Sequence, residues 1–160
     1  MFIHTYIHRL YNKYNQVQNK LRIMKLKILG AKIGGNVKSF GRFTVMNEKN
    51  LEIGDNSTLN EGVHINCRDK VIIGKGVRIS TNVQIHTGKL IINSYPRVHT
   101  QEKIIIEDNV WIASGVVISA GVTIKKNSII GANSVVTKNI EENSFYAGNP
   151  AKKIKELRNE

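Results

Sequence analysis

Residues 106–140 read IEDNVWIASGVVISAGVTIKKNSIIGANSVVTKNI, and an aliphatic residue recurs there at every sixth position. The positions are Ile106, Ile112, Ile118, Ile124, Ile130 and Val136. Four positions after each of the first five lies a small or β-branched residue: Val110, Val116, Val122, Ser128 and Ser134. A period of six fits neither an amphipathic helix nor an alternating strand. It is typical of a parallel β-helix of triangular cross-section, in which each hexad forms one short strand and one corner.

The same hexad appears twice more toward the N-terminus, and three hexads make one coil. The clear copies run through Ile53, Leu59 and Ile65 and through Ile73, Ile79 and Ile85, and a weaker copy runs through Ile33, Ser39 and Val45. We therefore expect coils to start at residues 33, 53, 73, 106 and 124. The long spacing between 73 and 106 predicts a loop at residues 88–103. Gly and Asn, which tolerate a positive φ, occur where corners are expected, at 54–56, 74–76, 107–109 and 131–133.

Length and composition indicate one folded domain without disulfides. With 160 residues and 41% hydrophobic content, the chain can bury a single core. No apolar run approaches the ~20 residues of a membrane-spanning helix. Cys67 is the one cysteine, which excludes an internal disulfide and a cysteine-built zinc site. The first residues include His, Arg and Lys where a signal peptide has its apolar centre, so we expect a cytoplasmic location.

Residues 1–29 are predicted to form a basic amphipathic helix, followed by a β-helix domain at residues 30–160. Apolar residues alternate at spacings of four and three from residue 3 to residue 28, which describes one stripe on a helix from about 3 to 25. We expect this stripe to cover the open end of the β-helix, to contact copies of itself in an oligomer, or to lie on an anionic membrane. Near the C-terminus, residues 149–157 are predicted to form a short helix begun by Pro150.

The net charge of +12 is concentrated in the N-terminal segment. Residues 1–47 contain nine Lys or Arg residues and no Asp or Glu, and the rest of the chain has a net charge of +3. Such a block of one sign indicates either a solvated helix face or an anionic partner: nucleic acid, a membrane surface or a phosphorylated ligand. Of these partners we predict peripheral contact with an anionic membrane through residues 1–29, and no nucleic acid.

Together with YAGNPAKKI at 146–154, the stretch 106–140 resembles the hexapeptide-repeat acyltransferases. It is most similar to the branch that holds galactoside and maltose acetyltransferases and surface-polysaccharide O-acetyltransferases. The resemblance covers roughly residues 31–157. It implies an all-β, left-handed parallel β-helix, a homotrimer with active sites between subunits, and acetyl-CoA as the acyl donor. The prism shape supports the trimer physically, because flat faces from two chains enclose a cleft that one prism does not.

The resemblance also implies that one histidine is the general base that takes the proton of the acceptor hydroxyl. The family's galactoside-type pattern places this histidine near Lys89 or Leu90, where the present chain has none. His86, at the end of a coil, and His99, inside the predicted loop, are therefore the two candidates for the catalytic base. The remaining histidines, expected on the N-terminal helix or on an outward coil face, are His4, His8 and His64.

The CoA moiety is placed by the same resemblance. Small residues at two corners would let the pantetheine arm approach the backbone, an aromatic residue would flank the arm, and lysines would bind the phosphates. The predicted cofactor-binding residues are Trp111, Ala113, Ser114, Gly131, Ala132, Lys138, Lys152 and Lys153, and the predicted substrate-binding residues are Tyr95 and Arg97. No metal site is predicted. Cys67 is expected to be structural, because no base that would activate its thiol is evident.

These observations predict an acetyl-CoA-dependent O-acetyltransferase. The resemblance favours as acceptor a saccharide hydroxyl of a bacterial surface polysaccharide, either capsule or lipopolysaccharide, or of its precursor. Two alternatives stay open at this point. One is an N-acetyltransferase that acts on a nucleotide-linked amino sugar, and the other is a trimeric β-helix scaffold without catalytic activity.

Overall fold

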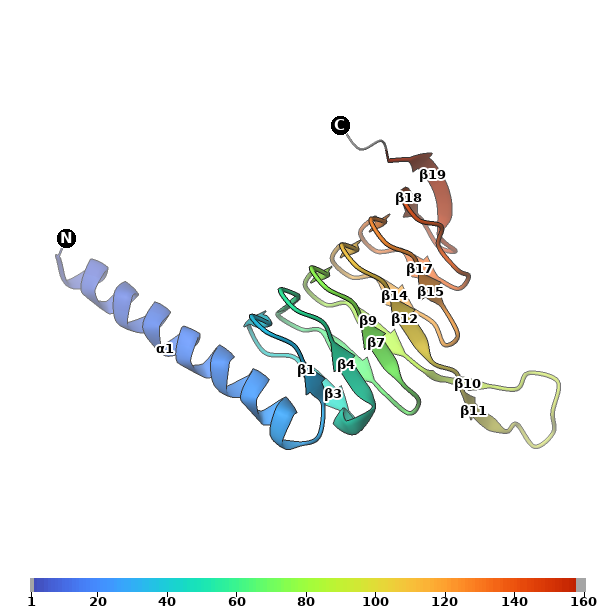
Figure 1. The fold of residues 1–160 in the computed structure, drawn as a ribbon, viewed down its shortest axis with the longest axis horizontal. Helices are drawn as coiled ribbons and strands as arrows, with labels where there is room; N and C mark the ends of the chain where they lie inside the picture. Colours follow the sequence, from blue (N-terminus) through green and yellow to red (C-terminus); the bar gives the residue numbers. More distant parts are fainter. Residues whose placement is uncertain (1, 158–160) are drawn as a thin grey trace.

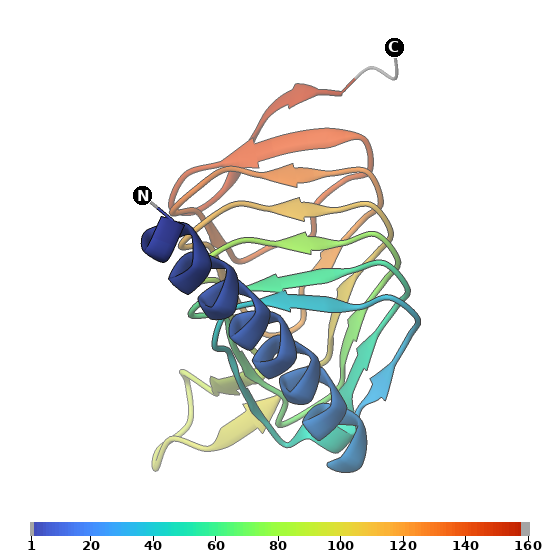
Figure 2. The same ribbon diagram turned by 90° about the vertical axis from the view of Figure 1, so that its left-hand side faces the viewer.

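The computed structural model describes residues 2–157, with side chains described from Tyr6 onward. An N-terminal helix, α1 (Phe2–Ile28), precedes a left-handed parallel β-helix of about six turns. A two-stranded hairpin projects from the side of the β-helix (Figure 1). The turns stack along one axis, so that strands far apart in the sequence lie side by side (Figure 2).

The turns supply short strands to three sheets, which we name sheets A, B and C. Sheet A consists of β1 (Lys32–Ile33), β4 (Leu51–Ile53), β7 (Val71–Ile73), β12 (Ile104–Ile106) and β15 (Thr123–Ile124). Sheet B consists of β2 (Lys38–Phe40), β5 (Thr58–Asn60), β8 (Arg78–Ile79), β13 (Trp111–Ile112), β16 (Ile129–Ile130), β18 (Ser144–Ala147) and β19 (Lys152–Glu156). Sheet C consists of β3 (Thr44–Met46), β6 (His64–Asn66), β9 (Gln84–His86), β14 (Val117–Ile118) and β17 (Val135–Val136). A short 3-10 helix, η1 (Glu48–Asn50), precedes β4.

The register of sheet A confirms the predicted coil starts. Ile33 pairs with Ile53, Ile53 with Ile73, Ile73 with Ile106, and Ile106 with Ile124. Residues that the hexad pattern treats as equivalent therefore occupy one column of the sheet. The additional residues between coils lie outside the strands, at the corners and in the hairpin.

Aliphatic side chains from the hexad starts fill the interior of the prism. The isoleucines at 106, 112, 118, 124 and 130 are completely buried. Each packs against its equivalents in the coils above and below. The resulting columns are densely packed, and both dispersion attraction and the burial of apolar surface stabilise the fold. The core thus runs the length of the solenoid without a break.

Asparagines stabilise the corner between sheets A and B. Asn36, Asn56, Asn109, Asn127 and Asn143 all lie there with φ between 50° and 60°. The side-chain amide of Asn109 donates to Oδ1 of Asn127 at 3.3 Å, and that of Asn127 donates to Oδ1 of Asn143 at 2.9 Å. Asparagine tolerates this left-handed backbone better than most residues with a side chain, and here it also links successive coils.

The predicted loop at 88–103 contains an antiparallel hairpin at its base, and residues 91–98 connect the two strands. β10 (Gly88–Leu90) pairs with β11 (His99–Gln101). Buried Thr87 fixes its base: its Oγ1 donates to the Asn66 carbonyl at 2.9 Å, and its own carbonyl accepts from the Glu102 N–H at 2.9 Å. Because both ends of the insertion leave one corner side by side, their backbones can pair directly.

Helix α1 confirms the predicted N-terminal helix and continues to Ile28. The chain then turns at Gly30, whose φ of +94° places it in the left-handed region. The Gly30 N–H donates to the Lys27 carbonyl at 3.1 Å, and the Ala31 N–H donates to the Leu26 carbonyl at 3.0 Å. This arrangement is a glycine C-cap, which satisfies carbonyls at the helix end and directs the chain into β1.

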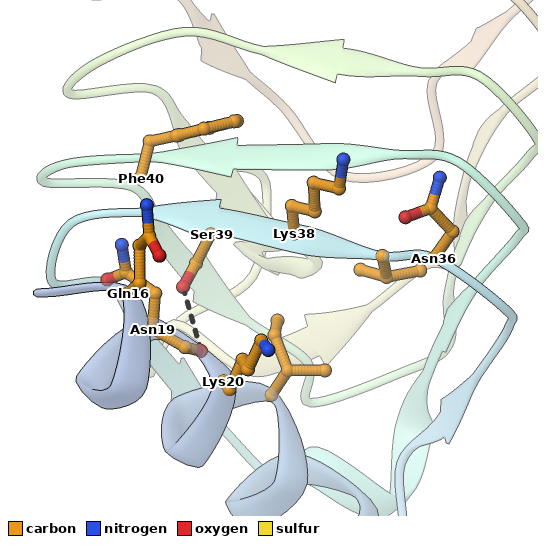
Figure 3. Close-up of a pocket in the computed structure, with 9 residues that line it drawn as sticks. Gln16, Asn19, Lys20, Asn36, Lys38, Ser39 and Phe40 are labelled. Atoms are coloured by element: carbon orange, nitrogen blue, oxygen red, sulfur yellow. Dashed lines mark hydrogen bonds between the residues drawn. The ribbon is translucent and has the colours of Figure 1, made fainter. Parts of the chain in front are cut away.

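The helix contacts the first coil through a face other than its apolar stripe. Ile23 and Leu26 are buried, and the Asn19 carbonyl accepts a hydrogen bond from Ser39 Oγ at 3.2 Å (Figure 3). The described residues of the stripe, from Ile7 onward, are exposed. The expectation that the stripe covers the end of the β-helix is therefore wrong, because the turn after the helix directs a different face to the coil. Residues 3 and 4 lie outside the described side chains.

The predicted C-terminal helix at 149–157 is also wrong. Residues Lys152–Glu156 form β19, which pairs antiparallel with β18 after a turn. Without this pairing β18 would be the edge of sheet B, with a row of unsatisfied N–H and C=O groups. A helix of so few residues has little intrinsic stability, whereas the strand gains hydrogen bonds to an existing edge.

Within residues 2–157, no helix combines the length and apolar character needed to cross a membrane. In the same part of the chain, His, Cys, Asp and Glu side chains nowhere gather in groups of three that would hold a metal ion.

We predict that Asn127→Ala lowers the melting temperature more than Asn127→Gly. Both variants lose the hydrogen bonds to Asn109 and Asn143, but only alanine must also adopt a φ near 58° with a Cβ, which costs on the order of 1–2 kcal/mol. Thermal unfolding followed by circular dichroism measures the difference. Equal melting temperatures for the two variants would show that the backbone conformation contributes nothing at this corner.

Candidate active site

The outward face of sheet C carries a group of polar side chains next to the base of the hairpin. In β6 and β9 the central isoleucine is buried and its neighbours point outward, so the two strands present His64, Asn66, Gln84 and His86. The register places Asn66 beside His86 and His64 beside Gln84. The imidazole centroids of His64 and His86 are 5.6 Å apart, and Nε2 of His86 lies 3.2 Å from Oε1 of Gln84.

The surroundings of His86 favour its neutral form. Burial is the larger cause and the neighbouring His64 the smaller, and both lower the pKa of His86 below its usual value. A neutral imidazole is ready to accept a proton, which is what a general base requires. Beside it, the buried Oδ1 of Asn66 has no hydrogen-bond partner within the described chain, and such an acceptor is suited to a donor from a bound molecule.

His99 comes to the same place from the hairpin. It lies opposite Leu90 in the β10–β11 pair and is exposed. His86 and His99 line one open hollow of about 570 Å³, together with Asn66 and Arg68. The structure therefore brings the two predicted catalytic histidines together, although they come from different elements.

The other predicted hairpin residues lie outside this hollow. Tyr95 and Arg97 occupy the tip, where the guanidinium carbon of Arg97 is 5.3 Å from the centre of the Tyr95 ring. Lys89, which with Leu90 marks where the resemblance led us to expect a histidine, lines the hollow and forms an ion pair with Glu102 across the base of the hairpin. In a single chain, the two predicted substrate-binding residues therefore do not reach His86.

The four small residues predicted to approach CoA stack at the corner between sheets B and C. The N–H groups of Ala113 and Gly131 already donate to Ile130 and Tyr146 of the next coil, at 3.0 and 2.8 Å. Within residues 2–157, by contrast, the N–H groups of Ser114 and Ala132 have no partner. These two N–H groups are free to pair with an amide chain.

Gly131 is small for a reason of packing as well. A Cβ at this position would lie 2.9 Å from Cβ of Ala147 and 3.3 Å from the ring of Phe145. The residue therefore allows the last coil to approach, whatever else binds at the corner.

The larger predicted cofactor residues are spread around the prism. Half-exposed Trp111 stands on sheet B next to the small-residue corner and donates from Nε1 to Ser80 Oγ at 3.2 Å. Lys138 is exposed at the corner between sheets C and A, whereas Lys152 and Lys153 lie on β19 at sheet B. Lys153 is held by Glu141 at 2.6 Å and Glu156 at 3.2 Å, and these carboxylates raise its pKa. One chain therefore does not assemble all these lysines into a single phosphate site.

The two halves of the predicted site lie at opposite edges of sheet C. His86 ends β9 at the corner with sheet A, and Ser114 lies at the corner with sheet B. One side of a coil spans about six residues, or at most about 20 Å. A base at one edge of sheet C and a CoA thioester bound at the other edge do not meet within one chain, unless the CoA arm crosses the sheet.

Asn66 and Arg68 also line the histidine hollow and were not predicted. The signal was available, because Asn66 follows inward Ile65 just as His86 follows inward Ile85 one coil later. Cys67, predicted to be structural, is buried. Burial, and to a smaller extent the Glu48 carboxylate, raise the pKa of the Cys67 thiol to about 12, so it stays protonated near neutral pH.

We predict that His86 titrates below pH 6.5 and that His64→Gln moves its midpoint part of the way back up. The variant removes the neighbouring positive charge but leaves burial, the larger cause of the lowered pKa, in place. Imidazole chemical shifts followed by NMR across pH 4.5–8 give both midpoints. A wild-type midpoint at or above 6.5, or no upward movement in the variant, would contradict this electrostatic account.

Comparisons with known proteins agree with this architecture. The family described as bacterial transferase hexapeptide (six repeats) matches residues 103–138. A maltose O-acetyltransferase from Clostridium difficile 630 superposes with a TM-score of 0.84 at 31% identity, over 97% of this chain and 86% of the other. Comparison with curated protein sequences finds no significant match.

Two further solved structures contain a CoA species. A hexapeptide-repeat acetyltransferase from Vibrio cholerae O1 biovar eltor, complexed with acetyl-CoA, has a TM-score of 0.83 at 29% identity, over 95% of this chain and 85% of the other. A galactoside acetyltransferase in complex with coenzyme A has a TM-score of 0.80 at 32% identity, over 86% of this chain and 70% of the other. The repeat, the fold and these likenesses together show that the chain belongs to the hexapeptide-repeat acetyltransferases.

Proposed function

We propose that this protein transfers an acetyl group from acetyl-CoA to a hydroxyl of a saccharide. The observation that carries the proposal is the pair of His86 and Asn66, a neutral base beside an unpartnered buried acceptor, at the edge of a β-helix face. The donor is supported by the relatives solved with acetyl-CoA or CoA, and the acceptor class by the maltose and galactoside enzymes.

We further propose that the active protein is a homotrimer. Its support is the separation of the two half-sites, since His86 and the Ser114 corner occupy opposite edges of sheet C. Threefold rotation of a triangular prism brings the edge of one chain to the opposite edge of the next, which joins the histidine hollow to a neighbour's corner. The exposed tip of the hairpin, with Tyr95 and Arg97, then projects toward the neighbouring chain and is available to hold the acceptor.

In the proposed reaction His86 accepts the proton of the acceptor hydroxyl as its oxygen attacks the thioester carbonyl. The carbonyl electron pair moves to oxygen, and a free backbone N–H, such as that of Ser114 in the neighbouring chain, stabilises the negative charge. Collapse of the tetrahedral intermediate breaks the C–S bond. The imidazolium of His86 returns its proton to the departing thiolate, so that CoA leaves as a thiol and the enzyme is unchanged.

Asn66 and His99 have supporting roles in this scheme. The Asn66 Oδ1 accepts a hydrogen bond from the saccharide substrate, and exposed His99 lines the other side of the hollow. Within this scheme we propose as acceptor a saccharide of a bacterial surface polysaccharide or its precursor. The cytoplasmic location stays a prediction.

We predict that His86→Ala lowers kcat by about 10²–10⁴-fold, because the proton then has no base to accept it. His99→Ala is expected to change KM for the acceptor more than kcat, since His99 is exposed on the hairpin. Release of free thiol from acetyl-CoA, with maltose, galactosides and amino sugars as acceptors, measures both. His8→Gln, on α1, serves as the control. Full turnover in His86→Ala would remove His86 as the base, and transfer only to amino sugars would overturn the O-acetylation proposal.

Mixed trimers give a second prediction. His86→Ala removes the base, and Ala132→Glu places a carboxylate at the exposed corner where CoA is proposed to bind. Subunits of the two inactive variants, unfolded together and refolded at equal concentration, should recover about a quarter of wild-type activity, because a quarter of the interfaces then combine an intact base with an intact corner. Each variant refolded alone is the control. No recovery in the mixture, despite confirmed mixed trimers, would place both groups in the same chain's site.

A further inference from the structure

The apolar stripe of α1 has no partner within the described chain. Its described members, spaced at alternating intervals of three and four, are Ile7, Leu10, Tyr14, Val17, Leu21, Met24 and Ile28. Every one of them exposes between 45% and 76% of its surface. Seven large apolar side chains on one helix face are more than the scattered apolar residues of an ordinary protein surface, and such a patch marks a site of interaction.

The stripe points away from the β-helix. At about 100° per residue, its centre lies roughly 180° around the helix axis from the face that holds Asn19, Ile23 and Leu26 against the first coil. Figure 2 shows the helix crossing in front of the strands of sheet B, and Figure 3 shows the contact with β2 on the inner side. Closer packing of α1 onto its own chain would therefore leave the stripe uncovered.

Cations flank the stripe, four on one side of it and one on the other. Arg9, Lys13, Lys20 and Lys27, at intervals of four, seven and seven residues, project about 100° away from the centre of the stripe. Lys25 lies at its other margin, and all five are exposed. Long basic side chains beside an apolar face can extend sideways, so that their charges reach an anionic surface while the face is buried.

The charge pattern distinguishes the possible occupants. Residues 1–47 contain no Asp or Glu, so two or more copies of α1 that met through their stripes would bring together cations with no counter-charge from the helices. An anionic bilayer offers the apolar stripe a hydrocarbon region and offers the flanking cations phosphate groups. Tyr6, Tyr11 and Tyr14 are exposed on or beside the same face, and tyrosine favours the boundary between hydrocarbon and water.

We propose that α1 lies in the surface of an anionic phospholipid membrane, with its stripe in the outer hydrocarbon region and its cations at the headgroups. The β-helix then remains outside the bilayer, attached through the opposite face of the same helix. The inference concerns the binding of the protein to lipid and does not depend on which reaction it catalyses.

Flotation of the full-length protein with vesicles tests the proposal. We expect it to float with vesicles of phosphatidylcholine containing 30% phosphatidylglycerol, and to float far less with pure phosphatidylcholine or in 0.5 M salt. Lys13→Gln, Lys20→Gln and Lys27→Gln combined should lower the partition coefficient about a hundredfold, at roughly fivefold per charge. The matched control is Lys103→Gln, Lys125→Gln and Lys155→Gln combined, which removes the same charge from exposed positions on the β-helix and should bind as the wild type does.

A stripe variant separates a membrane from a second copy of the chain. Leu10→Gln combined with Val17→Gln should abolish flotation, yet leave the melting temperature and the sedimentation coefficient unchanged, because glutamine is a good helix former and both side chains face solvent in the free protein. A fall in either quantity would show that the stripe is covered by another copy, which would overturn the proposal. Wild-type protein that does not float with anionic vesicles, or equal losses in the two lysine variants, would overturn it as well.

Discussion

The stacking of each inward side chain on its equivalent in the next coil is the interaction on which this molecule depends. A single coil cannot bury its three inward residues, because it has no core of its own, so each coil is stable only between neighbours. The column of Ile33, Ile53, Ile73, Ile106 and Ile124 in sheet A shows how strictly this requirement fixes the register. Because side chains alternate between faces, a slip of one residue would turn isoleucines outward, and the core would be lost.

The ends of the solenoid follow from the same requirement, and the two ends meet it in different ways. At the C-terminal end, β19 pairs with the edge of β18 and satisfies its backbone groups. At the N-terminal end, α1 covers the first coil, and from Tyr6 onward the side chains that it buries are Ile23 and Leu26. The first coil is also the weakest copy of the hexad, with Ser39 at an inward position. This serine is buried, and its hydroxyl donates a hydrogen bond to the Asn19 carbonyl of the helix. The serine at this inward position therefore has a hydrogen-bond partner on the helix.

Sequence alone predicted the parts of the fold that repeat. The six-residue period gives the sheets, the inward residues and the coil starts, because a strict period leaves one register in which every large aliphatic residue is buried. It does not reach segments that occur once. Residues 152–156 became a strand because an open sheet edge was present, and no local pattern in KKIKE shows that edge. The hairpin likewise depends on both ends of the insertion leaving the same corner, which is a property of the solenoid.

In the candidate site, too, the residues that belong to the repeat could be predicted, and those in segments that occur once could not be placed. His86 was found from its place at the end of a hexad, and the repeat also implies Asn66 beside it, although that pairing appears only when two coils are aligned. His99 reaches the hollow through the hairpin register, which no spacing reveals. The stripe on α1 shows another limit of sequence patterns. Its period correctly predicted a helix with an apolar face, but the direction in which that face points depends on the turn at Gly30. Periodicity identifies which residues share a surface, and the connections between elements decide what that surface meets. In this protein one face of the helix packs against the β-helix, while the opposite face, apolar and flanked by cations, points outward. A single helix can therefore connect the β-helix to the proposed membrane surface.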